Sequence, residues 1–198
     1  MNLPNKLTVS RLALTLLFLV AVFVRFPWHN TIAFVLFAVA SLTDFFDGRI
    51  ARARKLITNF GILMDPLADK ILTCSAFIAL VERGVIEPKV EVQVNAWMVC
   101  VIVGRELAIT GLRMMAASKN VVLAAEGYGK HKTISQMVCL TALMVLVSVP
   151  EWGAAGAALF DPWLPWFVVI MLWLSVLLTL LSGSLYLWNN RDLFLNDM

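Results

Sequence analysis

The sequence has few charged residues. Only 15% of its 198 residues are Asp, Glu, Lys or Arg, whereas 61% are hydrophobic. Soluble globular domains carry about 25% charged residues, so this composition argues against an ordinary soluble protein. The formal net charge is only +3, which offers no electrostatic reason to expect a nucleic-acid partner.

Cysteines and flexible linkers are also scarce. Cys74, Cys100 and Cys139 lie in separate apolar stretches, without a CxxC pair or a Cys/His cluster. This spacing predicts neither a disulfide framework nor a zinc site, and we interpret the cysteines as small buried hydrophobic residues. No Gly/Ser-rich linker, low-complexity run or internal repeat divides the chain. We therefore expect residues 1–198 to form one domain.

Long apolar segments are what the sequence does contain. A membrane-spanning helix needs about 20 mostly apolar residues. Six segments meet this length approximately: 7–25, 31–52, 61–82, 95–117, 132–150 and 165–188. No small-residue cleavage site follows the first, so we expect it to stay in the protein. The predicted fold class is an all-α polytopic membrane protein, a bundle of six transmembrane helices.

The basic residues predict how this bundle is oriented. An even number of spans puts both termini on one side of the membrane. Most of the basic residues fall on that side: Lys6, Arg11, Arg49, Arg52, Arg54, Lys55, Lys119, Lys130, Lys132 and Arg191. The other side has only Arg25, Arg83 and Lys89, together with several acidic residues. Because loops rich in Lys and Arg stay in the cytoplasm, we expect cytoplasmic termini.

Four aspartates lie at the cytoplasmic ends of the second and third segments. Asp44 and Asp47 are three residues apart, and Asp65 and Asp69 are four apart. Both spacings place a pair of carboxylates on one helix face. Carboxylates at membrane depth are costly unless something compensates them. Hard oxygen ligands suit Mg²⁺, Mn²⁺ or Ca²⁺, and paired cations can promote in-line displacement at phosphorus.

The residues between these aspartates suit a phosphate ligand. Gly48 has no side chain to crowd the carboxylate face, and Arg52 follows Asp44 by eight residues, within reach of an anion held there. The basic cluster from Arg49 to Lys55 has a simpler alternative interpretation. In that interpretation, the cluster serves only to anchor the chain at anionic lipid head groups.

The pattern Asp44-x-x-Asp47-Gly48-x-x-Ala51-Arg52, followed after eight residues by Gly61-x-x-x-Asp65-x-x-x-Asp69, resembles the complete signature of the CDP-alcohol phosphotransferases. This resemblance implies that Asp44, Asp47 and Asp65 bind one cation and that Asp44, Asp65 and Asp69 bind a second, both Mg²⁺ or Mn²⁺. It implies that Asp69 is also the general base. It places Gly48, Arg52, Thr58 and Gly61 at the CDP moiety, and it implies a homodimer.

Three further segments resemble the bacterial branch of the family that makes phosphatidylglycerol phosphate: 3–11, 104–113 and 129–137. In the first, Asn5 and Thr8 are candidate ligands of CDP-diacylglycerol. Alternatively they only start the first helix, with Thr8 as its N-cap.

The other two segments supply cations that would suit an acceptor with its own phosphate: Arg105, Arg113, Lys130 and Lys132. Glycerol 3-phosphate is such an acceptor. Inositol phosphate and phosphatidylglycerol would also fit, whereas serine lacks the phosphate. Two alternatives stay open, because Arg105 could form a structural ion pair with Glu106, and Lys130 and Lys132 could be topology signals.

The expected activity is transfer of the phosphatidyl group of CDP-diacylglycerol to glycerol 3-phosphate in a bacterial cytoplasmic membrane, with release of CMP. Two other classes of function remain. A proton- or ion-coupled transporter could use aspartates within its spans as relays, and an inactive scaffold could share the fold. CMP release distinguishes an enzyme from both.

Overall fold

The computed structural model describes the backbone of residues 3–54, 59–83, 85–86, 92–118 and 128–191, and the side chains of residues 9–43, 70–83, 92–116 and 131–191. Six helices of 21 to 26 residues run through these ranges: α1 (Leu3–Phe23), α2 (His29–Arg54), α3 (Asn59–Glu82), α4 (Ala96–Ser118), α5 (Tyr128–Ser148) and α7 (Leu164–Asn189). Each predicted apolar segment therefore forms a helix.

Two short elements lie between α5 and α7. A 3-10 turn, η1 (Val149–Trp152), leads into the short helix α6 (Gly153–Phe160). Between α3 and α4, the two-residue strands β1 (Val85–Ile86) and β2 (Val92–Gln93) pair antiparallel. Within the described ranges, two helical stretches are long and apolar enough to cross a membrane, His131–Phe160 and Leu164–Asn189.

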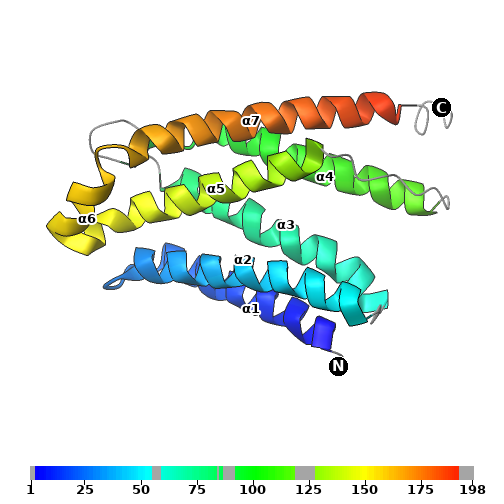
Figure 1. Cartoon of the computed structure of the whole chain (residues 1–198), viewed down its shortest axis with the longest axis horizontal. Helices are drawn as coiled ribbons and strands as arrows, with labels where there is room; N and C mark the ends of the chain where they lie inside the picture. Colours follow the sequence, from blue (N-terminus) through cyan, green and yellow to red (C-terminus); the bar gives the residue numbers. More distant parts are fainter. Residues whose placement is uncertain (1–2, 55–58, 84, 87–91, 119–127, 192–198) are drawn as a thin grey trace.

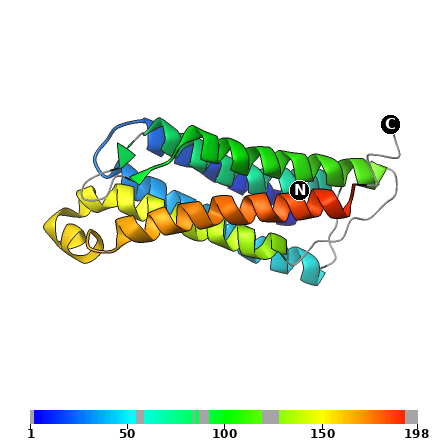
Figure 2. The same ribbon diagram turned by 90° about the horizontal axis from the view of Figure 1, so that it is seen from above.

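The long helices lie side by side along one axis (Figures 1 and 2). Helix α1 packs against α2 and α3, α5 packs against α7 and α2, and α4 packs against α7 and α3. Figure 1 shows the start of α1 and the end of α7 at the same end of the bundle. The end of α2, the start of α3, the end of α4 and the start of α5 lie there too. We call this the aspartate end.

One continuous apolar core joins the helices. Phe18 of α1 and Phe37 of α2 are fully buried, with ring centroids 5.9 Å apart, and Phe77 of α3 and Leu143 of α5 complete the centre. Buried alanines such as Ala33 allow the backbones to approach closely, as in membrane helix bundles. Large apolar side chains also cover the outside, among them Leu16, Ile170, Trp173 and Leu177. Such a surface suits contact with lipid rather than water.

The opposite end of the bundle is held by a carboxylate in η1. Glu151 accepts hydrogen bonds from the backbone N–H groups of Asn30, at 2.9 Å, and Thr31, at 2.8 Å. These are orphan donors of the first turn of α2, and a negative charge there is favoured by the helix dipole. Trp152 donates from Nε1 to the Thr31 hydroxyl at 3.0 Å. The connection after α5 is thereby attached to the start of α2.

Candidate active site

The four aspartates lie on two helices that meet at the aspartate end. Asp44 and Asp47 are in the second half of α2, and Asp65 and Asp69 are in the first half of α3. Because both stretches are α-helical, each pair shares a helix face. Figure 1 shows the end of α2 close to the start of α3. The backbone therefore brings the two carboxylate-bearing segments to the same end of the molecule.

Several predicted ligands lie outside the described side chains. These are Asn5, Thr8, Asp44, Asp47, Gly48, Arg52, Gly61, Asp65, Asp69 and Lys130, and Thr58 lies outside the described backbone as well. One alternative is nevertheless wrong. Helix α1 begins at Leu3, so Thr8 lies within the helix and is not its N-cap.

A divalent cation fits the chemistry of the aspartate set. The donors are carboxylate oxygens only, which suit Mg²⁺ or Mn²⁺ better than soft metals. Among the residues whose side chains are described, no group of three or more His, Cys, Asp or Glu could hold a metal ion. The aspartate set therefore remains the candidate metal site.

A cluster of charged side chains surrounds the buried Glu106, and one of its members, Lys70, directly follows Asp69 in the sequence. Lys70 of α3 donates from Nζ to Glu106 Oε2 at 3.1 Å, and Lys132 of α5 forms an ion pair with Glu106 Oε1. The side chains of Glu106 and Lys132 are 7% and 4% exposed. Removal of one member of such a cluster would be strongly destabilising, because the remaining buried charge would lack a partner. The carboxylate therefore holds the two ammonium groups in place. The Glu106 carboxylate thus connects α3, α4 and α5.

The structure shows whether Arg105 forms an ion pair with Glu106, which the sequence left open. Arg105 Nη1 lies 3.7 Å from Glu106 Oε1, farther than the Lys70 contact. The ion pair with Glu106 therefore exists, but the lysines are the nearer partners. Lys70 was missed in the sequence, although a lysine directly after Asp69 in an apolar helix was a usable signal.

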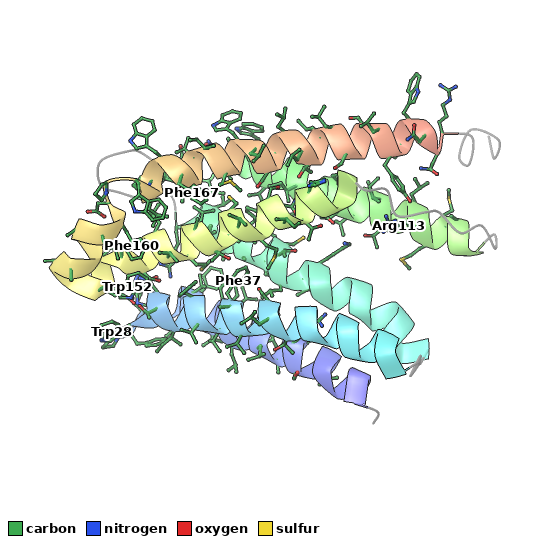
Figure 3. All side chains as sticks on the ribbon, in the orientation of Figure 1. Trp28, Phe37, Arg113, Trp152, Phe160 and Phe167 are labelled. Atoms are coloured by element: carbon green, nitrogen blue, oxygen red, sulfur yellow. The ribbon has the colours of Figure 1, made fainter. Side chains whose placement is uncertain are left out.

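The two arginines of α4 lie against α7. Arg105 donates from Nη2 to the Ser182 hydroxyl at 3.4 Å, and its stem crosses Gly183, where a Cβ would come within 2.8 Å of Arg105 Cγ. Arg113 donates from Nε to the Tyr186 hydroxyl at 3.2 Å, with its guanidinium 5.3 Å from the ring centroid. Figure 3 shows Arg113 near the aspartate end of α4. Helix α7 therefore positions both guanidinium groups.

A polar seam continues between α5 and α7. Gln136 donates from Nε2 to the Thr179 hydroxyl at 3.0 Å, and both side chains are buried. The structure thus brings Arg105 and Lys132 together around Glu106, whereas Arg113 lies two turns farther along α4 beside Tyr186. Polar side chains deep in an apolar bundle are costly and typically mark a functional site.

Comparison with known proteins identifies the family of this chain. Residues 1–181 match the model of a family described as CDP-alcohol phosphatidyltransferase. The chain belongs to that family. The family is embedded in membranes and generally depends on metal ions. Within it, the resemblance suggested by the aspartate signature is confirmed.

Individual members of the CDP-alcohol phosphatidyltransferase family match most of the chain. A CDP-diacylglycerol–glycerol-3-phosphate 3-phosphatidyltransferase of Bacillus subtilis is 36% identical over 96% of this chain and 96% of its own length. A protein of the same name from Rickettsia bellii is 32% identical over 93% of both chains. A probable phosphatidylglycerophosphate synthase of Mycobacterium tuberculosis is 34% identical over 93% of this chain and 79% of its own length.

Proposed function

We propose that this protein is a phosphatidylglycerophosphate synthase. It transfers the phosphatidyl group of CDP-diacylglycerol to glycerol 3-phosphate, giving phosphatidylglycerol phosphate and CMP. The observation that carries this proposal is the complete aspartate signature on α2 and α3, in a chain similar over nearly its whole length to relatives named for this reaction.

The aspartates form the metal-binding part of the site. Asp44, Asp47, Asp65 and Asp69 hold two divalent cations, Mg²⁺ or Mn²⁺. When bound, these cations neutralise phosphate charge and orient the oxygens at the reacting phosphorus. The helical backbone contributes by presenting each carboxylate pair on one face.

The donor is held by residues around the same helix ends. Gly48 and Gly61 let the nucleotide approach the backbone, and Arg52 can bind phosphate in forked geometry. Asn5, Thr8 and Thr58 complete the candidate ligands of CDP-diacylglycerol. The acyl chains of the donor remain in the surrounding lipid, which suits the apolar outer surface of the helices.

The reaction itself is a displacement at phosphorus. The Asp69 carboxylate accepts the proton of the primary hydroxyl of glycerol 3-phosphate. The hydroxyl oxygen forms a bond to the phosphorus attached to diacylglycerol, and the bond from that phosphorus to the CMP oxygen breaks. CMP leaves with the electron pair of the broken bond.

The acceptor site is formed by the cations of α4 and α5, Arg105, Arg113, Lys130 and Lys132. The contacts of Arg105, Arg113 and Lys132 favour an acceptor that carries a phosphate. Around Glu106, Lys70, Lys132 and Arg105 supply three positive charges to one carboxylate, so positive charge remains for an anion. Arg113 adds a further guanidinium on the same helix. Glu106 acts as a positioning residue that holds the cations without touching the reacting atoms.

The membrane arrangement that we propose has six spans, cytoplasmic termini and a cytoplasmic active site. The aspartate end also holds both ends of the described chain (Figure 1), and it carries most of the basic residues. The setting is the cytoplasmic membrane of a bacterium. We propose a homodimer, on the family resemblance.

Release of CMP tests the proposed reaction. Purified protein in detergent receives CDP-diacylglycerol, Mg²⁺ or Mn²⁺, and one acceptor from the set glycerol 3-phosphate, inositol phosphate, serine and phosphatidylglycerol. We expect release with glycerol 3-phosphate only. Release of CMP with another acceptor would support the class of reaction but overturn glycerol 3-phosphate as the acceptor. If folded protein released no CMP with any of the four acceptors, the enzyme assignment would be overturned.

A further inference from the structure

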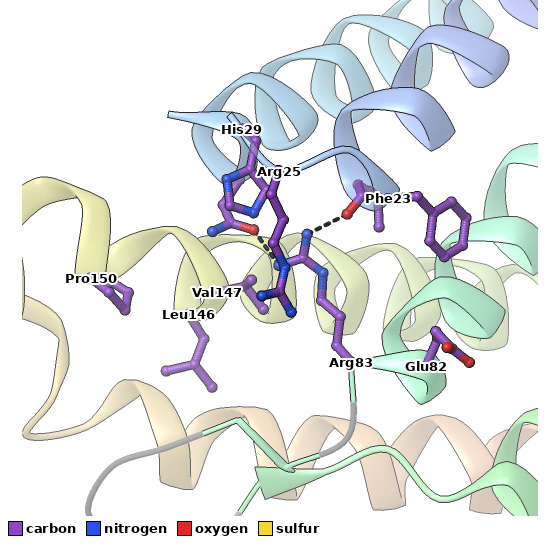
Figure 4. A pocket seen from close by; sticks show the side chains of 10 residues that line it. Phe23, Arg25, His29, Glu82, Arg83, Leu146, Val147 and Pro150 are labelled. Atoms are coloured by element: carbon purple, nitrogen blue, oxygen red, sulfur yellow. Dashed lines mark hydrogen bonds between the residues drawn. The ribbon is translucent and has the colours of Figure 1, made fainter. Parts of the chain in front are cut away.

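A polar cavity lies at the end of the bundle opposite the aspartates. It has a volume of about 650 Å³ and opens between the ends of α1, α3 and α5 and the start of α2. Its charged and polar lining is Arg25, His29, Asn30, Glu82 and Arg83. Figure 4 shows the guanidinium groups of Arg25 and Arg83 next to each other. We call this cavity the arginine pocket.

Arg83 is held in place within the arginine pocket. Its Nη1 donates to Asn30 Oδ1, and its Nη2 donates to the Val22 carbonyl at 2.7 Å. The pKa of Arg83 is lowered, mainly because the guanidinium is partly buried. The charge of Glu151 opposes this shift, and the charge of Arg25 adds to it. Because a guanidinium stays protonated in proteins, the pocket keeps two adjacent positive charges.

Among the residues whose side chains are described, the acidic residues near the arginine pocket leave these charges largely uncompensated. Glu151 is committed to the start of α2 and lies 3.4 Å from His29 Nδ1. Figure 4 shows the Glu82 carboxylate pointing away from both guanidinium groups. Within the described residues, Arg25 has neither a hydrogen bond nor an ion pair. Two converging guanidinium groups with an open cavity in front of them are suited to bind a phosphate.

An apolar groove continues from the arginine pocket along the outside of the bundle. It has a volume of about 360 Å³ and shares Phe23 and Glu82 with the pocket. Its other lining residues come from α3 and α4: Ile78, Val81, Ala96, Val99 and Cys100. We call it the α3–α4 groove. Phe23 and Ile78 are about half exposed at its wall, where lipid would meet the protein.

We propose that the arginine pocket and the α3–α4 groove together bind one phospholipid molecule. Its phosphate lies between Arg25 and Arg83, and one acyl chain lies in the α3–α4 groove. The order of the two cavities matches the amphipathic order of a phospholipid, with an anionic head beside an apolar chain. This site lies at the other end of the bundle from the aspartates and does not depend on the proposed reaction.

Photo-cross-linking tests the site directly. The purified protein in detergent is mixed with phosphatidylglycerol that carries a diazirine on one acyl chain, at a concentration below saturation. After illumination, mass spectrometry maps the labelled peptides. We expect labelling at residues 78–82 and 96–100. Arg25→Gln should reduce it about tenfold, because one charge-assisted contact with phosphate is lost.

Matched controls separate the possible causes. Arg191→Gln removes an arginine that stacks on Trp188, outside the arginine pocket, and should leave the labelling unchanged. Arg25→Lys should restore part of it. Arg25→Gln should also keep the wild-type rate of CMP release, so failure of this site and failure of the proposed reaction are distinguishable.

Three outcomes would overturn the proposal. Equal labelling of wild type and Arg25→Gln would show that the arginine pocket does not contribute to lipid binding. Equal labelling by a diazirine-bearing diacylglycerol, which lacks phosphate, would leave a purely apolar groove. Full displacement of the lipid by an equal concentration of inorganic phosphate would show that the pocket takes a free anion instead.

Discussion

The two ends of the bundle each contain a partly or fully buried glutamate, and they use it differently. Glu106, at the aspartate end, is surrounded by side-chain cations from α3, α4 and α5. Glu151, at the opposite end, accepts hydrogen bonds from two backbone N–H groups and the hydroxyl of Thr31. A carboxylate satisfied by a helix start stabilises the fold alone, whereas one that holds excess cations leaves positive charge for a ligand.

The largest effect should come from the aspartates that we propose to bind metal ions. Asp44→Ala removes a carboxylate that we propose both cations share, and it should lower CMP release by about a thousandfold or more, since charge at the reacting phosphates is no longer neutralised. Asp161→Ala, in the turn between α6 and α7, is the matched control and should keep the wild-type rate. A folded Asp44→Ala variant with undiminished turnover would contradict the metal site.

Substitution of Glu106 should affect both stability and the acceptor. Glu106→Gln leaves the buried Lys132 and the partly buried Lys70 without a carboxylate, which should cost about 3 kcal/mol in the free energy of unfolding. We also expect a higher KM for glycerol 3-phosphate, with a smaller change for CDP-diacylglycerol, because the cations shift. Thermal unfolding and separate titration of the two substrates measure these effects. An unchanged KM for glycerol 3-phosphate would make the cluster purely structural.

Substitution of Glu151 should affect stability alone. Glu151→Gln keeps a hydrogen-bond acceptor but removes the negative charge at the start of α2, which should cost about 1 kcal/mol. Both KM values and kcat should match the wild type, because the bundle length separates Glu151 from the aspartates. Thermal unfolding and the CMP assay check this together. A raised KM would break the contrast between the two glutamates.

The smallest expected effect concerns Gly183. In Gly183→Ala the new methyl group meets the stem of Arg105, which must move by a few tenths of an ångström or more. We expect the KM for glycerol 3-phosphate to rise about threefold while the Tm changes little, because the flexible arginine side chain can give way. Gly111→Ala is the control, because its Cβ would meet nothing within 4 Å.

The sequence alone was sufficient to predict the helices and the family, and the helices carry the four aspartates. Six apolar segments of about 20 residues predict six long helices, and α1 to α5 and α7 confirm them. The positions of Asp44, Asp47, Asp65 and Asp69 were readable because ligand spacing on a helix is a local property. The family, too, followed from this spacing, and the match over residues 1–181 confirmed it.

Contacts between segments far apart in the chain could not be predicted from the sequence. Lys70 and Lys132 reach Glu106 across 36 and 26 residues of sequence, and Glu151 reaches Asn30 across 121. The sequence of an apolar helix says little about which helices it packs against, since many arrangements bury a similar area. The helix α6 and the turn η1 were missed because their residues continue the apolar run of α5.

The sequence by itself determined that this protein is a helical membrane protein with an aspartate signature, because hydropathy and ligand spacing are local. Only the tertiary structure decided which charges meet. It placed Glu106 among cations from α3, α4 and α5 and brought Arg25 and Arg83 together at the other end. For Glu106 the physical reason is that a charge buried within an apolar bundle is stable only with a partner, and helix packing decides which residues become its partners.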